Sequence, residues 1–202
     1  SGAADTDPGQ GAQRILHGLQ ALGPDVLGRQ DRDRPAIGIG GDVGEPEQCE
    51  ALCRQALAEH GPIDIVINNV GGRRENIPTE SMPLDAWRKL MDLNLTSVML
   101  CTRTLGAAMI ERGGGGRIIN IGSILGKNGG NARPWIDPSE QSRSGNVAYG
   151  ISKAGVHTLT TYLARELASS RITVNAVAPG PIASEMTKTF PDSLKSLIPL
   201  GR

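Results

Sequence analysis

The chain has 202 residues with 21 basic and 21 acidic side chains, so its formal net charge is zero. This balance lacks the basic excess expected of a protein that binds nucleic acid or an anionic membrane surface. No apolar run approaches the roughly 20 residues of a membrane span, and no signal peptide opens the chain, so we expect a soluble, cytoplasmic protein. Hydrophobic residues make up 38% and aromatic residues only 2%, which predicts a single domain over residues 1–202 with an aliphatic core.

Helix-like and strand-like stretches alternate along the chain. The first predicted helix follows the cap Asp7-Pro8, because apolar residues recur there at helical spacing: Ile15, Leu16, Leu19 and Leu22. Further helices are predicted from Pro46 to a stop at Gly61, over Met82–Arg112 and over Val147–Ser170. Short β-branched runs predict strands at Ile63–Ile67, Arg117–Ile121 and Ile172–Val177, with a weaker one at Ala36–Gly40.

This alternation predicts the fold class α/β, as a Rossmann-like, doubly wound parallel sheet with helices on both faces. Ligands of such sheets bind beyond the carboxyl ends of the strands, so the residues that follow each strand are candidates for chemistry. These segments are rich in small and amide residues: Gly40–Gly44, Asn68–Gly72, the loop that presents Ser123, and Ala178–Ser184. Each of them, taken alone, is also compatible with an ordinary turn.

The three cysteines, Cys49, Cys53 and Cys101, contain no Cys-x-x-Cys pair. Cys49 and Cys53 lie one helical turn apart, and we expect them to pack in the core. The sequence therefore predicts a reducing compartment, with no structural disulfide and no metal site.

One stretch combines a tyrosine and a lysine four residues apart, Tyr149 and Lys153. On a helix these side chains share a face with their Cβ atoms about 5–6 Å apart. A nearby ammonium favours the phenolate and lowers the pKa of the tyrosine, which ordinarily lies near 10. Such a tyrosine is suited to proton exchange near neutral pH, although a pair of this kind also arises by chance.

Several motifs follow one another in a fixed order: Asp42-Val43, Asn68-Asn69-Val70-Gly71, Asn94 in "DLNLTS", Ser123, Tyr149-x-x-x-Lys153 and Pro179-Gly180-Pro181-Ile182. Together they resemble the classical short-chain dehydrogenase/reductase family over nearly the whole chain. The resemblance implies hydride transfer between a nicotinamide cofactor and a secondary alcohol or ketone.

The resemblance also implies the roles of individual residues. Tyr149 would be the general acid/base, Ser123 would hold the substrate oxygen, Lys153 would grip the nicotinamide ribose, and Asn94 would carry a water linked to the lysine. The implied cofactor site consists of Asp5, Asp42, Val43, Asn68, Asn69, Gly71, Tyr149, Lys153, Pro179, Gly180, Ile182 and Ser184.

Cofactor choice depends on Asp5, which falls where NAD-dependent relatives keep an acid for the adenosine ribose hydroxyls. A carboxylate there repels a 2′-phosphate, so NAD is expected over NADP, unless Asp5 is merely a loop acid. The family's Gly-rich phosphate loop and C-terminal strand have no counterpart in this sequence. We therefore expect a family member that is incomplete at both ends, with a degenerate, cofactor-free chain as the alternative.

The segment between Ser123 and Tyr149 is longer than in the family, which predicts a polar insertion over residues 127–145 on the substrate side. It carries Arg133, Trp135, Asp137 and Arg143, and Arg73 and Arg74 are placed to reach the same mouth. Convergent arginines suit a carboxylate or phosphate group, but a solvated surface loop explains them equally well.

Three functional hypotheses follow. The first is an alcohol dehydrogenase or ketone reductase acting on a polar or acidic small molecule such as a sugar acid or polyol. The second is a 3-oxoacyl-thioester reductase, which predicts NADPH preference against the indication of Asp5. The third is a non-catalytic subunit without cofactor. The helices 82–112 and 147–170 carry apolar residues on more than one face, which predicts a homodimer or homotetramer built on them.

Overall fold

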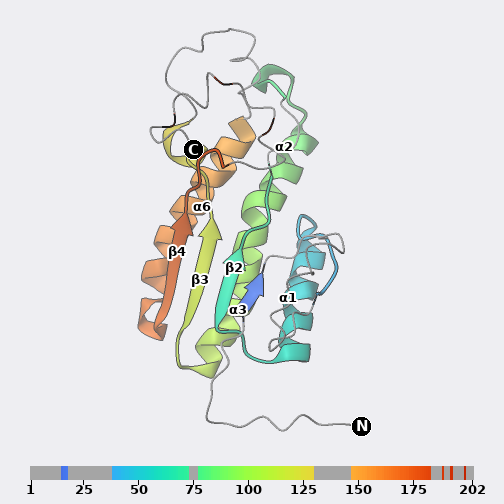
Figure 1. Ribbon diagram of the computed structural model, residues 1–202. Helices are drawn as coiled ribbons and strands as arrows, with labels where there is room; N and C mark the ends of the chain where they lie inside the picture. Colours follow the sequence, from blue (N-terminus) through green and yellow to red (C-terminus); the bar gives the residue numbers. More distant parts are fainter. Residues whose placement is uncertain are drawn as a thin grey trace.

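The computed structural model describes residues 15–17, 38–72, 77–129 and 147–182, together with the single positions 188, 192 and 198, and at 15–17 it describes the backbone alone. Four parallel strands form one sheet in chain order: β1 (Ile15–His17), β2 (Ile65–Asn68), β3 (Gly116–Ile121) and β4 (Ile172–Val177). Asn68 lies opposite Asn120, so β2 and β3 end close to the same level. Figure 1 shows β2, β3 and β4 pointing toward the same end of the molecule.

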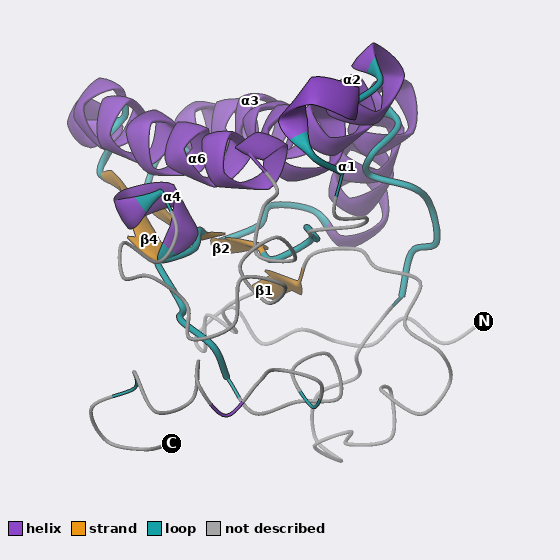
Figure 2. Cartoon of the chain, turned by 90° about the horizontal axis from the view of Figure 1, so that it is seen from above, coloured by secondary structure: helices purple, strands orange, loops and turns teal. Residues whose placement is uncertain are grey.

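The helices are α1 (Pro46–His60), α2 (Leu84–Met91), α3 (Ser97–Arg112), α4 (Leu125–Asn128) and α6 (Val147–Glu166), with 3-10 turns at Thr79–Ser81 and Ala168–Ser170. A π-helical segment, Asp92–Thr96, joins α2 to α3 into one helical stretch. In Figure 2, α1, α2, α3 and α6 lie on one face of the sheet. Right-handed crossovers that advance across a sheet in one direction place their helices on one face. Any helical layer on the other face therefore lies outside the described residues.

The ends of two helices follow from local sequence. Pro46 stands in the first turn of α1, where its missing N–H leaves no intrahelical bond unmade. Gly61 and Gly113 end α1 and α3 with φ of 70° and 71°, a backbone region that glycine enters without steric penalty. The predicted helix from Pro46 to the stop at Gly61, the predicted end at Arg112 and the strand Ile172–Val177 are confirmed, whereas the helical stretch expected from Met82 begins at Leu84.

Two clusters of buried apolar residues hold the helices on the sheet. The larger one joins α1, α3 and the C-terminal end of α6 to β2, β3 and β4; among its members are Ala56, Val66, Leu105, Ile118 and Ile172. The smaller one lies nearer the carboxyl ends of the strands and comprises Val43, Cys49, Leu52, Val70, Leu93 and Leu100. Because aromatic residues are almost absent, both clusters are aliphatic, as expected from the composition.

Within the described residues, one helical stretch, Leu84–Arg112, is long and apolar enough to cross a membrane by length and composition alone. The expectation that no apolar stretch approaches the length of a membrane span is therefore wrong by length and composition. Half of the most apolar window is buried inside the fold, because α3 packs against α1, β2 and β3. Such burial is the ordinary reason for an apolar helix in a core.

Two predicted elements are wrong. The helix expected over Ile15–Leu22 contains instead the strand β1, whose residues pair in parallel with Ile65–Ile67. The open edge of β2 offers Ile15–His17 a ladder of backbone hydrogen bonds, and this pairing overrides a helical periodicity carried by only four side chains. The weaker strand expected at Ala36–Gly40 has no regular structure at Gly38–Gly40. Glycines on both sides of Ile39 disfavour a strand, although Ile39 still packs against both core clusters.

Candidate active site

Lys153 is the charged group at the centre of the candidate site. It lies on α6, only 3% exposed, and its Nζ donates a hydrogen bond of 2.7 Å to the backbone oxygen of Ile121 at the end of β3. Burial disfavours the charged ammonium and lowers the pKa of Lys153 to about 8. Tyr149 precedes it by one turn on the same helix, as the sequence predicted.

Ser123 lies two residues beyond β3 and is buried. Its Oγ accepts a 3.2 Å hydrogen bond from the backbone N–H of Leu125, the first residue of α4. From α6, the Nε2 of His157 lies 3.0 Å from the Ser123 backbone oxygen and 3.4 Å from its nitrogen. The next residue, Ile124, donates to the oxygen of Pro179, so this loop is tied to the one that follows β4.

Asn94 stands in the π-helical segment and is fully buried. Its Oδ1 accepts from the N–H of Gly72 at 2.8 Å, and its Nδ2 donates to the oxygen of Gly72 at 3.0 Å. Both groups of one peptide residue in the loop after β2 are thus satisfied by one side chain. A π-bulge inside an α-helix is frequent at functional sites, because the extra residue redirects a side chain.

Gly71 shows how close these groups come to one another. A Cβ placed on Gly71 would lie 2.7 Å from Asn94 Oδ1 and 3.0 Å from Lys153 Nζ. Glycine is therefore required at this position, since any side chain would displace the amide or the ammonium. Asn94, Gly71 and Lys153, which the sequence predicted as site residues, thus meet at the carboxyl ends of β2 and β3.

Asn68 supports the site from inside the fold. Its Nδ2 donates to Asn120 Oδ1 at 2.8 Å, Asn120 Nδ2 donates to Thr160 Oγ1 at 2.9 Å, and that hydroxyl donates to the oxygen of Val156. This buried chain of polar side chains joins β2, β3 and α6. The motif identified Asn68, but Asn120, Thr160 and His157 were missed.

The remaining described residues of the predicted cofactor site surround the strand ends. Asp42 is exposed, and its Oδ1 accepts from the N–H of Gly44 at 2.8 Å, which shapes the turn before α1. Val43 is buried in the smaller core cluster, and Asn69 is exposed after β2. Beyond β4, Pro179 is half-buried while Gly180 and Ile182 are exposed.

Other predicted residues lie outside the described part of the chain. They are Asp5 and Ser184 of the cofactor site, Arg73 and Arg74 after β2, and Arg133, Trp135, Asp137 and Arg143 of the 127–145 insertion. The cofactor preference and the role of the insertion therefore stay predictions.

The parallel sheet, with Ser123, Lys153 and Asn94 gathered at the carboxyl ends of its strands, defines a Rossmann-like α/β domain. A family model described as enoyl-(acyl carrier protein) reductase matches residues 3–202. The chain belongs to the short-chain dehydrogenase/reductase family, as its motifs indicated.

Relatives of known name include two 3-oxoacyl-(acyl-carrier-protein) reductases. The one from Synechocystis sp. is 36% identical over 168 residues, covering 83% of this chain and 62% of the relative. The one from Haemophilus influenzae, FabG, is 34% identical over 203 residues, covering 93% of this chain and 78% of the relative. The chain therefore spans less than two thirds of the length of the Synechocystis protein.

Solved structures agree on the fold. A Sinorhizobium meliloti protein assigned as a short-chain alcohol dehydrogenase superposes with a TM-score of 0.68 at 30% identity, over 81% of this chain and 60% of that chain. A Burkholderia xenovorans protein assigned as a short-chain dehydrogenase/reductase gives a TM-score of 0.66 at 27% identity, over 79% of this chain and 58% of that chain.

Proposed function

We propose that this protein is a nicotinamide-dependent reductase that interconverts a 3-oxoacyl thioester and the corresponding 3-hydroxyacyl thioester. The observation that carries the proposal is the convergence of Asn94, Gly71, Lys153 and Ser123 at the carboxyl ends of β2 and β3. Relatives at 34–36% identity are named 3-oxoacyl-(acyl-carrier-protein) reductases. They favour this substrate class over the sugar acid or polyol that we expected first.

The residues present fit a nicotinamide cofactor. Lys153 carries three N–H donors, and among the described residues only Ile121 accepts from it, so two donors remain for ribose hydroxyls. A Cβ on Gly72 or Gly180 would meet no atom within 4 Å, so the backbone at the strand ends is open to a flat ligand. When bound there, the cofactor supplies the hydride that reduces the carbonyl carbon.

The side chains of the chain handle the oxygen and the proton. Ser123 Oγ already accepts the Leu125 N–H, so its own O–H is left to donate to the substrate carbonyl oxygen. Tyr149 gives its phenolic proton to that oxygen as charge develops on it. Lys153, one helical turn further along α6, is charged at pH values below about 8.

Two apolar side chains suit an acyl substrate. Val177, the last residue of β4, and Ile182, in the loop beyond it, are both exposed at the edge where the strands end. A hydrocarbon chain gains about 25 cal/mol for each Å² of apolar surface that it covers. A polyol gains nothing comparable from these side chains.

A substrate panel tests the proposal. Initial rates would be measured by nicotinamide absorbance with 3-oxoacyl thioesters of increasing chain length, starting from acetoacetyl. Keto sugar acids and polyols would serve as the competing class. We expect kcat/KM to be highest for the 3-oxoacyl thioesters. Turnover of the sugar acids alone would restore the first hypothesis, and no turnover of any carbonyl would favour the non-catalytic subunit.

Asp5 and the proposed substrate class predict different cofactors. Asp5 favours NAD, whereas the 3-oxoacyl thioester hypothesis predicts NADPH. We retain the preference for NAD as a proposal. It is tested by comparing kcat/KM for NADH and NADPH in the wild type and in Asp5→Ser, in which discrimination against NADPH should relax. A wild-type preference for NADPH would overturn the role given to Asp5.

We also propose a cytoplasmic homodimer or homotetramer that forms through the long helices. The outward stripe of α6 carries the apolar residues Val147, Ile151 and Tyr162, and that of α3 carries Met99 and Ile110. Tyr162 is 68% exposed, so a large apolar ring needs a cover. Sedimentation should show a dimer or tetramer, and Tyr162→Asp should shift it toward the monomer. A wild-type monomer at tens of micromolar would contradict this proposal.

A further inference from the structure

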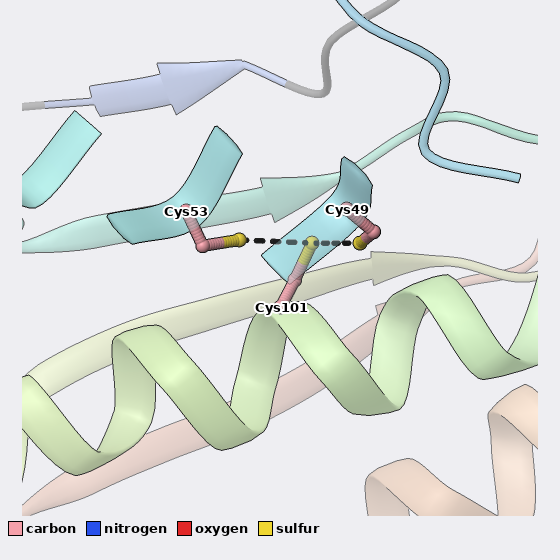
Figure 3. Close-up of side chains that lie close together, drawn as sticks. All are labelled: Cys49, Cys53 and Cys101. Carbon is pink, nitrogen blue, oxygen red and sulfur yellow. Dashed lines mark hydrogen bonds between the residues drawn. The ribbon is translucent and has the colours of Figure 1, made fainter. Parts of the chain in front are cut away.

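Three sulfur atoms meet between the helices α1 and α3. Cys49 and Cys53 come from successive turns of α1, and Cys101 comes from α3 (Figure 3). The Sγ of Cys101 lies 3.6 Å from each of the other two, and all three sulfurs lie within 4.8 Å of one another. Two sides of 3.6 Å and a third no longer than 4.8 Å form a compact triangle.

The triangle is enclosed by the fold. Cys49 and Cys53 are 0% and 1% exposed, while Cys101 is partly accessible. The sulfurs interact with one another and, for Cys49, with the backbone oxygen of Ser97 at 3.7 Å. Sequence analysis predicted that Cys49 and Cys53 would be buried in the core, which is confirmed, but it did not place Cys101, 48 residues further on, beside them.

The thiols also influence one another's ionisation. The hydrogen bond from Cys101, helped by Cys53, lowers the pKa of Cys49 to about 4. Hydrogen bonds to Cys49 and Cys53, together with burial, raise the pKa of Cys101. A bound cation is the usual means of deprotonating buried thiols.

We propose that Cys49, Cys53 and Cys101 form a three-thiolate site for a thiophilic divalent cation of the Zn²⁺ type. A Zn–S bond of about 2.3 Å at tetrahedral angles separates the sulfurs by about 3.8 Å, close to the observed spacing. Thiolates select Zn²⁺ over the hard cations Mg²⁺ and Ca²⁺. Binding forms three Zn–S bonds and releases the remaining thiol protons to solvent, with no change in oxidation state. A water would complete the four-coordinate geometry that Zn²⁺ prefers.

The surrounding charges favour a divalent ion. Three thiolates leave a net charge of −1 on Zn²⁺ but −2 on Cu⁺, and a larger uncompensated charge is more costly to bury. Glu50 forms ion pairs with Arg54 of its own helix, at 3.5 Å, and with Arg103 of α3. Each of these three residues follows one of the cysteines by one or two positions, and their formal charges sum to +1. They also tie together the two helices that would hold the ion.

The direct test uses the purified, reduced, full-length protein freed of metal by a chelator. Titration with Co²⁺, a spectroscopic stand-in for Zn²⁺, should give one equivalent of binding with thiolate-to-cobalt charge-transfer bands in the near ultraviolet. Addition of Zn²⁺ should remove these bands by displacement. Absence of charge-transfer bands in the wild type would overturn the proposal without recourse to any variant.

Variants assign the ligands. Cys101→Ser and Cys49→Ser should each weaken Zn²⁺ binding at least 100-fold, measured by competition with a chromophoric chelator. The matched control is Thr102→Val, which alters the neighbouring buried residue of α3 and leaves all three thiols in place; its affinity should equal that of the wild type. If the cysteine variants bind as tightly as the control, the ion is held elsewhere and the proposal fails.

Zn²⁺ should also stabilise the fold, because an ion that binds only the folded state raises its stability. The melting temperature of the wild type should rise with Zn²⁺ concentration, and that of Cys101→Ser should not. Since the zinc ligands share no side chain with the candidate active site, carbonyl reduction and zinc binding can succeed or fail separately. Equal shifts in both proteins would again contradict the assignment.

Discussion

Two buried polar regions of this molecule differ in what their side chains bond to. At the strand ends, Asn94 bonds both backbone groups of Gly72, and Lys153 bonds the backbone oxygen of Ile121. Between α1 and α3, the three cysteines bond chiefly to one another. The first region is fixed by backbone groups at the strand ends and in the loop that follows β2. The second is fixed only by the packing of two helices, and its chemistry depends on which ligand, if any, the sulfurs share.

The largest effect expected in the strand-end region is on catalysis. Tyr149→Phe removes the transferable proton and keeps the ring, so kcat should fall at least about 100-fold while cofactor affinity changes little. The chain offers a matched control in its other tyrosine, because Tyr162→Phe alters an exposed ring of α6 and should leave kcat unchanged. Steady-state kinetics on both variants check this, and near-normal turnover in Tyr149→Phe would remove the tyrosine from the mechanism.

Asn94 tests whether the backbone bonds hold the loop. Asn94→Leu keeps the branched shape but leaves the N–H and oxygen of Gly72 without their partner, so the free energy of unfolding should fall by about 2–4 kcal/mol. Urea denaturation measures it. Asn175→Ala, at an exposed position of β4, is the control and should change stability by less than about 0.5 kcal/mol. A loss no greater than that of the control would mean that the loop is held by other contacts.

The buried ammonium of Lys153 should support turnover but lower the free energy of unfolding. Its folded-state pKa of about 8 lies below the ordinary value of 10.5, so the unfolded chain binds the proton more tightly. Below pH 8 the buried charge then destabilises the protein by at most about 3 kcal/mol, and stability rises with pH between about 8 and 10.5 as the penalty disappears.

Lys153→Met should abolish turnover and yet raise stability by about 1–2 kcal/mol at pH 7, since the lost bond to Ile121 offsets part of the gain. The advantage over the wild type should shrink toward pH 10. Lys127→Met, which alters an exposed lysine of α4, should show neither effect. Denaturation at pH 7 and pH 10 makes the comparison, and a destabilised variant at pH 7 would show that the ammonium contributes more to the fold than burial removes.

The sequence predicted most of the strand-end region because its residues belong to short motifs in chain order. Ser123 follows, and Lys153 contacts, a strand end that hydrophobic runs already indicated, and right-handed crossovers bring such ends together. Asn120 and Thr160 escaped, since a buried hydrogen bond between β3 and α6 depends on register and leaves no pattern along either element.

The sulfur cluster escaped for a related reason. The step from Cys49 to Cys53 is visible as one helical turn, but the approach of Cys101 is set by how α1 and α3 pack, which periodicity does not specify. The same limit produced the error at Ile15–His17. The short apolar run Ile15–His17 forms a strand because it pairs with the open edge of β2. That edge lies at least 48 residues away in sequence, so local periodicity does not reveal it.

The smallest expected effect lies beside the sulfur cluster and sharpens the contrast with Asn94. Thr102 is buried on α3 and, among the described residues, its Oγ1 has no hydrogen-bond partner. Replacing it by valine removes a desolvated hydroxyl and keeps the branched shape, so Thr102→Val should stabilise the protein by up to about 1 kcal/mol. Asn94 and Thr102 lie on the same continuous helical stretch and are both polar and buried. Opposite signs for Asn94→Leu and Thr102→Val in urea denaturation would show that hydrogen-bond satisfaction, rather than polarity or burial, decides the contribution of each. A loss of more than about 1 kcal/mol in Thr102→Val would mean that the hydroxyl has a partner, such as a buried water.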